Sequence, residues 1–456
     1  MNYEPASFET CEGEGGSLLV VALLAPVVGA ASGVVGAIFR LSLDRADDLR
    51  NGLVAWAHGW KFLGFLALTI ACALATGMSA WLVRRYAPQA SGSGIPHVEA
   101  VLRGELPPAR FRLIPVKFLG GLLAIGSGLA LGREGPSVQM SASIAHLIGK
   151  LFNRDWVDCR VLLAAGAGAG LATAFNAPMA GAIFVLEELV RRFEVRIAIA
   201  ALGASATAIS VSRVLLGDAP DFHVGALAYA GAATRPLYFV LGAVAGLVAI
   251  VYNRVLLATI AAAKQLNYRP PELRAALVGA MVGIFAWFAP DLVGGGDSIT
   301  QQALAGVGTL AAISVVFVFR FGLASVSYAA GTPGGLFAPM LVLGAQIGLV
   351  FGILCRMAFP DLDIQPVGFA VVGMAAFFTG SVRAPLTGIV LVTEMTANVT
   401  MLLPMLGACF VAMLVPTLLG NPPIYDSLRE SAGQPEGKLS PAATVGAIAA
   451  AGPEPR

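Results

Sequence analysis

Charged residues are scarce in this chain. The 29 lysines and arginines and the 27 aspartates and glutamates make up 12% of the 456 residues, about half of the ~25% of an ordinary soluble domain. So few charges cannot cover the surface of a water-soluble protein of this length, which excludes a soluble globular enzyme and a disordered chain. The net charge of +2 offers no basic stripe, so a nucleic-acid-binding protein is excluded as well.

Cysteine and histidine are also few, and neither forms a metal-binding pattern. Five cysteines and four histidines are scattered along the chain, with no CxxC pair and no HExxH spacing. We therefore expect no disulfide framework, no metal and no cofactor. An intramembrane protease would need a nucleophile beside a base, or metal ligands at helical spacing, and neither is found. The sequence predicts a protein that is not an enzyme.

Long apolar segments are what the chain has in abundance. Hydrophobic residues make up 57% of it, and 54 glycines accompany them. Residues 17–39 are too long an apolar run for a signal peptide and lack a basic segment before them, so we expect a retained membrane helix. Other stretches fall short of the ~20 residues that a straight span needs, which predicts broken helices that end inside the membrane. These further stretches lie near 62–83, 113–131, 161–189, 197–216, 236–262, 274–289, 302–319, 336–359, 367–379, 386–395 and 401–419.

The two ends of the chain are polar or of low complexity. Residues 1–16 are polar, and residues 431–456 are rich in Ala, Pro and Gly, which predicts a disordered tail. Basic clusters at Arg84–Arg85, Arg191–Arg192 and Lys264 with Arg269 are expected to face the cytoplasm. We expect a multi-pass protein of the cell's inner (plasma) membrane, in contact with the lipid bilayer, with both termini in the cytoplasm.

An internal repeat divides the chain in two. Residues 175–188 read FNAPMAGAIFVLEE and residues 382–395 read VRAPLTGIVLVTEM, and GREGP at 132–136 similarly matches GLFAP at 335–339. The two pairs are offset by 207 and 203 residues, so they lie nearly in register. We expect two membrane halves, 17–216 and 236–430, joined by a linker at 217–235. Repeated halves with broken helices are typical of transporters, whose binding site lies between the halves.

Three glycine-containing turns each precede an apolar helical run. They are GSGIP at 92–96, GREGP at 132–136 and GGLFAP at 334–339. Glycine permits close approach of the backbone, proline suits the first turn of a helix, and a helix N-terminus presents free N–H groups with about half a positive charge. Ordinary interhelical turns are the simpler interpretation of any one of them. Three together predict an anion site made of helix N-termini.

These motifs, in this order and at this spacing, resemble those of the CLC family of chloride channels and chloride/proton exchangers. The resemblance runs from about residue 17 to 430. It implies an all-helical membrane fold of two inverted-topology halves with broken and tilted helices, and a homodimer in which each subunit has its own anion path. The tail is too short for the paired cytoplasmic CBS domains of many eukaryotic relatives, so we expect a form of the prokaryotic type.

The resemblance also implies two hydroxyl groups at the anion site. Ser93 is similar to the serine that contacts the central anion, and Tyr425, in NPPIYDSL, to the tyrosine that supplies the second hydroxyl. A helix cap is the simpler interpretation of Ser93, and an interfacial aromatic that of Tyr425. Serine at this position suggests chloride, because family members with proline there tend to prefer nitrate.

Backbone groups complete the site that the resemblance implies. Leu336 and Phe337 are similar to the pair whose N–H groups donate to the anion. The residues that surround the external anion site are Gly132, Arg133 and Gly135.

Glu134 resembles the gating glutamate of the family. Its ionised carboxylate at a helix N-terminus would imitate an anion and fill the anion's place, and protonation would release it. Stabilisation of a helix start alone contributes only about 0.3–1 kcal/mol at exposed sites. Ionisable groups inside a membrane segment are usually functional, which favours the gating role.

Glu188 matches the inner proton-transfer glutamate that separates exchangers from channels in the family. It follows Glu187 and precedes Arg191 and Arg192, so a salt-bridged helix end is the simpler interpretation. The residues alone leave open which of the two glutamates carries the proton.

Three more charged residues are expected to have supporting roles. Glu99 and Lys117 are expected to form a buried ion pair, and Glu394, the repeat partner of Glu187, is expected to be structural.

Together these features predict a secondary active antiporter that exchanges chloride for protons. The transported ions are its expected small partners, and no nucleic acid is expected. The alternative is a passive voltage- or pH-gated chloride channel of the same fold, which the presence of Glu188 disfavours.

Overall fold

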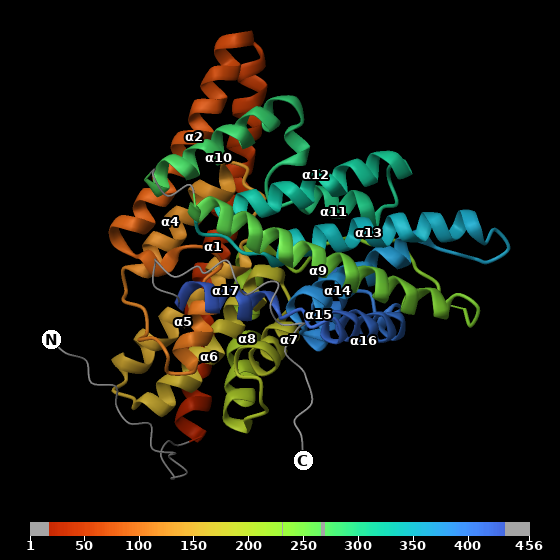
Figure 1. Cartoon of the computed structure of the whole chain (residues 1–456). Helices are drawn as coiled ribbons and strands as arrows, with labels where there is room; N and C mark the ends of the chain where they lie inside the picture. The colour runs from red at the N-terminus through yellow and green to blue at the C-terminus, as the bar shows by residue number, and fades with distance from the viewer. Residues whose placement is uncertain (1–17, 230, 266–269, 434–456) are drawn as a thin grey trace, which may run out of the picture.

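The structure, a computed structural model, describes residues 18–229, 231–265 and 270–433 (Figure 1). The polar segment 1–16, Cys11, Arg269 and the tail from residue 434 onward lie outside the described residues. The described part is built of 17 α-helices and contains no sheet, as the sequence predicts.

The helices are broken and of very unequal length, because glycine and proline interrupt the apolar runs. The expected helix at 17–39 is longer than predicted and continues to His58, whereas the apolar run 161–189 breaks at an Asn-Ala-Pro turn. Before the linker the helices are α1 (Leu18–His58), α2 (Lys61–Tyr86), α3 (Ile95–Leu102), α4 (Leu113–Gly126), α5 (Glu134–Leu151), α6 (Trp156–Phe175), α7 (Pro178–Phe184) and α8 (Val195–Leu216). After it they are α9 (Arg235–Gln265), α10 (Pro271–Phe288), α11 (Asp297–Leu304), α12 (Leu310–Ala329), α13 (Phe337–Ala358), α14 (Pro366–Val382), α15 (Pro385–Thr396), α16 (Leu402–Leu418) and α17 (Ile424–Gly433). Short turns η1 (Pro88–Ala90), η2 (Val185–Leu189, π-helical) and η3 (Pro290–Leu292) complete the helical structure.

Eight of these helices are long and apolar enough to cross a membrane. They are α1, α2, α6, α8, α9, α10, α12 and α13. Many of their large apolar side chains are exposed, as expected for a surface in contact with lipid tails.

The two halves repeat the same packing. Helix α1 packs against α8 as α9 packs against α16, and α5 packs against α6 as α13 packs against α14. Small residues allow the helices to approach closely: a Cβ atom on Gly29 would collide with the carbonyl oxygen of Ala204, and one on Gly242 with that of Ala408. The halves meet where α2 lies beside α10 and α7 beside α15, although these helices are far apart in the sequence (Figure 1).

The halves are inverted relative to each other. Glu394, near the end of α15, accepts hydrogen bonds from the N–H groups of Met179 and Ala180 at the start of α7, at 3.1 and 2.9 Å. Its repeat partner Glu187, just after α7, accepts the first N–H groups of α15 at 2.9 and 2.7 Å. Each of two equivalent helices therefore ends beside the start of the other. Equivalent helices that run antiparallel are related by a two-fold axis, as the predicted inverted repeat requires.

Candidate anion and proton path

Three helix N-termini converge because their preceding loops are joined by backbone hydrogen bonds. The N–H group of Gly92 donates to Thr332 at 3.2 Å, and that of Gly334 donates to Gly92 at 3.1 Å. Gly132 and Gly335 exchange two hydrogen bonds, of 3.0 and 2.7 Å. The loop before α13 is thus held between the loops before α3 and α5. The three motifs that the sequence singled out meet in one place.

The carboxylate of Glu134 occupies the point of convergence. Glu134 is fully buried, and its Oε1 atom accepts a hydrogen bond of 2.6 Å from the N–H group of Phe337, the first residue of α13. Its Oε2 atom has no hydrogen-bond partner among the described residues. A Cβ atom on Gly132 or on Gly335 would collide with this carboxylate in its present position, so the two glycines make room for it. A negative group lies where helix N-termini favour an anion.

Two buried hydroxyl groups lie beside this carboxylate. Ser93 and Tyr425 are both fully buried, and neither hydroxyl has a hydrogen-bond partner in the described part of the chain. The Tyr425 ring lies 5.9 Å from that of Phe337, and a Cβ atom on Gly135 would meet the Ser93 side chain. Buried hydroxyl groups normally have partners, so these two are available to donate to an anion.

Tyr328 is a neighbour of the site that the sequence did not indicate. Its hydroxyl oxygen accepts a hydrogen bond of 3.3 Å from the N–H group of Ser93. It lies near the end of α12, outside all three motifs, and only the tertiary fold brings it to the serine.

Two cavities of different size are lined by residues close to Glu134. The narrow cavity, of about 40 Å³, is lined by Gly132 and Arg133 and has room for a few water molecules. The wide cavity, of about 720 Å³, is lined by Ser93 and Tyr328. Basic residues that line the wide cavity are Lys264, Arg274 and Arg429. Arg429 is paired with Glu99, so Lys264 and Arg274 provide the positive charge that attracts anions to this cavity.

Arg133 points its side chain away from the hydroxyl groups. Its Nε atom donates to the carbonyl oxygen of Ala174 at 2.8 Å, and its Nη atoms lie 3.3 Å from Asp221 and 3.5 Å from Asp297. The guanidinium therefore borders the narrow cavity and is partly neutralised by two aspartates.

Glu188 is buried but reaches a third cavity. Its side chain is 3% exposed, and its Oε1 atom lies 3.3 Å from Nη2 of Arg191. It lies on the π-helical turn η2, a local irregularity that is frequent at functional sites. The Glu188 cavity, of about 650 Å³, is lined by both Glu187 and Glu188, together with Arg191, Arg192 and Arg383.

Glu187 is fully engaged as a helix cap. Besides the N–H groups of Leu386 and Thr387, its carboxylate accepts the Thr387 hydroxyl at 2.7 Å. The Glu187 carboxylate thus has three donors, whereas the Glu188 carboxylate accepts one side-chain hydrogen bond, from Nη2 of Arg191. The geometry thus favours Glu188 as the exchangeable site of the two.

The expected ion pair between Glu99 and Lys117 is wrong. Glu99 pairs with three arginines, Arg103 at 2.5 Å, Arg429 at 2.7 Å and Arg191 at 3.6 Å. Arg103 directly follows α3, Arg429 lies in α17 and Arg191 follows η2, so the carboxylate is satisfied without the lysine.

Lys117 instead holds the loop that carries Ser93. Its fully buried Nζ atom donates to the carbonyl oxygens of Ala90 and Gly92 at 3.0 and 2.7 Å. These two hydrogen bonds hold the lysine beside the loop that carries Ser93, and this explains why it does not reach Glu99. Among the described residues, no group of three His, Cys, Asp or Glu side chains could hold a metal ion.

The chain matches a known family over most of its length. A sequence profile described as "Voltage gated chloride channel" matches residues 72–417. The chain is 37% identical over 419 residues to the H(+)/Cl(-) exchange transporter ClcA of Salmonella arizonae, covering 90% of this chain and 88% of that one. The ClcA transporter of Citrobacter koseri matches with the same identity and coverage.

Solved structures show the same fold. A slow cyanobacterial Cl−/H+ antiporter superposes with a TM-score of 0.86 at 32% identity, covering 92% of this chain and 99% of that chain. A eukaryotic CLC transporter superposes with a TM-score of 0.77 at 22% identity, covering 91% and 74%.

Proposed function

The chain belongs to the voltage-gated chloride channel family, and from that premise we propose that it is a secondary active antiporter that exchanges chloride for protons. Relatives with 37% identity over nearly the whole chain are named as exchangers of these two ions. The observation that carries the proposal is the position of Glu134, a titratable carboxylate bound to the N–H group of Phe337 at the convergence of three helices. One group that both excludes an anion and takes up a proton couples the two fluxes.

The anion path runs from the wide cavity through the site to the narrow cavity. A chloride ion from the wide cavity would receive hydrogen bonds from the hydroxyl groups of Ser93 and Tyr425. The N–H groups of Leu336 and Phe337 and the glycines Gly132 and Gly135 form the next part of the path. Neutral donors and helix ends bind an anion weakly enough to release it, which transport requires.

Protonation of Glu134 opens the path. An ionised carboxylate competes with chloride for the same N–H groups, and a neutral carboxyl group binds them less strongly. The proton taken up neutralises the side chain, the side chain leaves, and chloride takes its place. Release of the proton returns the carboxylate and expels the chloride.

The inner end of the proton path is proposed at Glu188. It is buried, it borders the Glu188 cavity, and its neighbour Glu187 is occupied as a helix cap. Protons would pass between Glu188 and Glu134 through water or by side-chain rearrangement, on a route separate from the wide cavity.

The assembly and location are proposed from the family as well. We place the protein in the inner membrane of a cell, with both termini in the cytoplasm, the wide cavity facing the cytoplasm and the narrow cavity facing outward. A homodimer is proposed from the family alone, and one anion path per subunit is supported by the fact that Ser93, Glu134, Phe337 and Tyr425 meet within a single chain.

The test uses purified protein in chloride-loaded liposomes. Chloride efflux and external pH are recorded together, with and without a proton uncoupler. Exchange predicts that chloride efflux drives proton uptake against a gradient. Chloride efflux without proton movement would instead identify a passive channel of the same fold.

A further inference from the structure

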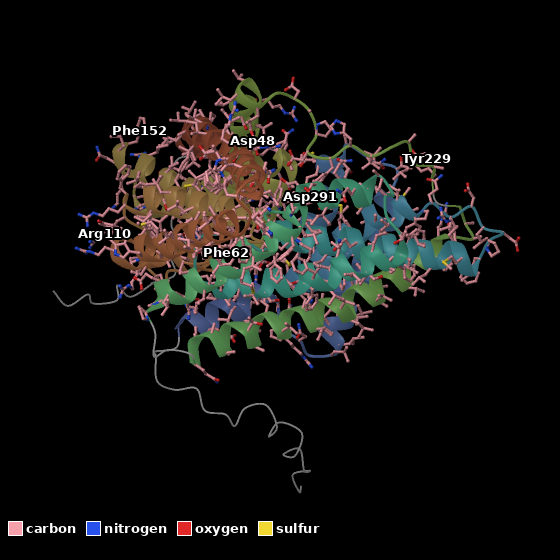
Figure 2. The ribbon with its side chains drawn as sticks, turned by 90° about the horizontal axis from the view of Figure 1, so that it is seen from above. Asp48, Phe62, Arg110, Phe152, Tyr229 and Asp291 are labelled. Carbon is pink, nitrogen blue, oxygen red and sulfur yellow. The ribbon has the colours of Figure 1, made fainter. Side chains whose placement is uncertain are left out.

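The linker between the two halves borders the narrow cavity. Phe222 is 5% exposed and lines that cavity together with Arg133. Its N–H group donates to the carbonyl oxygen of Met395, in α15, at 3.0 Å. Figure 2 shows the linker along the edge of the molecule marked by Asp48 and Tyr229. The linker is thus part of the wall of the proposed outer opening.

Both halves fix this part of the linker in place. The Nδ2 atom of Asn176, after α6, donates to the carbonyl oxygen of Ala219 at 3.0 Å. Gln301, in α11, accepts the N–H group of His223 at 3.0 Å and donates to its carbonyl oxygen at 2.8 Å. Side-chain hydrogen bonds on either side of Asp221 give it a defined position.

Asp221 uses this position to bridge two arginines. Its side chain is 4% exposed, with Oδ1 at 2.8 Å from Nη1 of Arg40 and Oδ2 at 3.3 Å from Nη2 of Arg133. A buried carboxylate is stable only when it is paired, and a buried pair is screened little by salt. The second acid at Arg133, Asp297, is 63% exposed and lies farther away, at 3.5 Å. Asp221 and Asp297 therefore both neutralise Arg133, and Asp221 is the buried acid of the two.

Arg133 is the residue next to Glu134, so its charge acts on the same path. An unpaired guanidinium at the narrow cavity would attract chloride strongly and slow its release. It would also be free to turn toward the Glu134 carboxylate and stabilise the closed state. An arginine held by a buried acid does neither.

On the basis of the proposed exchange function, we propose that Asp221 is a positioning residue that weakens chloride binding at the outer side by holding and neutralising Arg133. The linker is in this view a functional part of the transporter and not only a connection. Its role is to keep the affinity for chloride low at the outer opening, so that chloride leaves quickly.

The experiment compares Asp221→Asn with the wild type in liposomes. Initial chloride uptake is measured against external chloride to separate KM from maximum turnover. The KM for external chloride is expected to fall by about three- to tenfold, the effect of removing one nearby charge in a partly hydrated site. Maximum turnover is expected to fall as well, because release becomes slower.

Three further variants make the test specific. Asp218→Asn removes a carboxylate from the same linker that is 84% exposed and 4.0 Å from Arg213, so its KM should equal that of the wild type. Asp221→Glu restores the charge and should bring the KM back toward the wild-type value. Arg40→Gln leaves Asp221 to Arg133 alone and should raise the KM, which gives a second test if Asp221→Asn does not fold.

The outcomes separate this proposal from the exchange function. An unchanged KM in folded Asp221→Asn, with normal exchange in the wild type, overturns the role of Asp221 alone. A loss of thermal stability with no change in KM would show that Asp221 is merely structural, and this result also overturns the proposed role. If wild-type vesicles move no chloride, the proposed function fails and this proposal fails with it.

Discussion

Glu187 and Glu394 are equivalent residues of the two halves, and each caps the N-terminus of a helix in the other half. Glu187 accepts the first N–H groups of α15, and Glu394 accepts those of α7. This exchange ties the two halves together, and it leaves the Glu187 carboxylate occupied by three donors. Four predictions follow from the geometry of these carboxylates and of the site they surround.

The caps themselves can be tested as a matched pair. Glu187→Gln and Glu394→Gln should each lower the free energy of unfolding by about 1 kcal/mol, because a charged acceptor at a helix N-terminus is lost. Thermal unfolding in detergent should show similar shifts for both. Chloride/proton coupling in liposomes should be retained, and its loss in Glu187→Gln would place the proton path at that residue instead.

Glu188→Gln should separate the two ion fluxes. The amide cannot take up and release a proton as a carboxylate does, while the groups that bind chloride are untouched. We expect proton movement to fall to the background of protein-free liposomes and chloride efflux to continue. Glu187→Gln is the matched control, and proton uptake that persists in Glu188→Gln contradicts the assignment.

Glu134→Gln should remove the gate. A neutral side chain cannot replace chloride as an anion, so chloride flux should continue without proton coupling. In the wild type, more acidic medium protonates Glu134 and favours the open path, so chloride flux should rise as the pH falls. The variant should lose this dependence, which a series of efflux measurements at stepped pH would detect. A dependence as steep as that of the wild type would show that another group controls access.

Lys117→Met should weaken chloride binding. The Nζ atom of the lysine donates to two carbonyl groups of the loop that carries Ser93. Loss of this anchor should reduce chloride affinity by about five- to tenfold, as titration calorimetry would measure. Lys150→Met, at an exposed position on α5, is the control and should bind chloride as the wild type does.

The sequence predicted the features that depend on local pattern. Glycine and proline at 92–96, 132–136 and 334–339 marked the helix starts that meet at the site, since backbone conformation is a local property. The repeat of Ala-Pro, Gly and Glu also marked Glu187 and Glu394 as equivalent, and the structure shows that each caps a helix of the other half.

Partners across the fold were beyond the reach of local pattern. Spacing along α3 and α4 placed Glu99 and Lys117 in apolar surroundings, but it carried no information on which of several tertiary partners each would meet. Tyr328 and Asp221 were missed for the same reason. Each acts through a residue far away in the sequence, Ser93 and Arg133 respectively, and no motif surrounds either of them.

The unequal size of the two cavities has an electrical consequence. Solution that fills the wide cavity of about 720 Å³ stays close to the potential of the compartment it opens to. In the orientation proposed above, most of the transmembrane field then falls across the part of the path that contains Glu134. A unit charge that crosses the full field exchanges about 2.3 kcal/mol with it per 100 mV. The proposed displacement of the Glu134 carboxylate by a chloride ion thus takes place where the field is steepest. The rate of this step should therefore depend on the membrane potential.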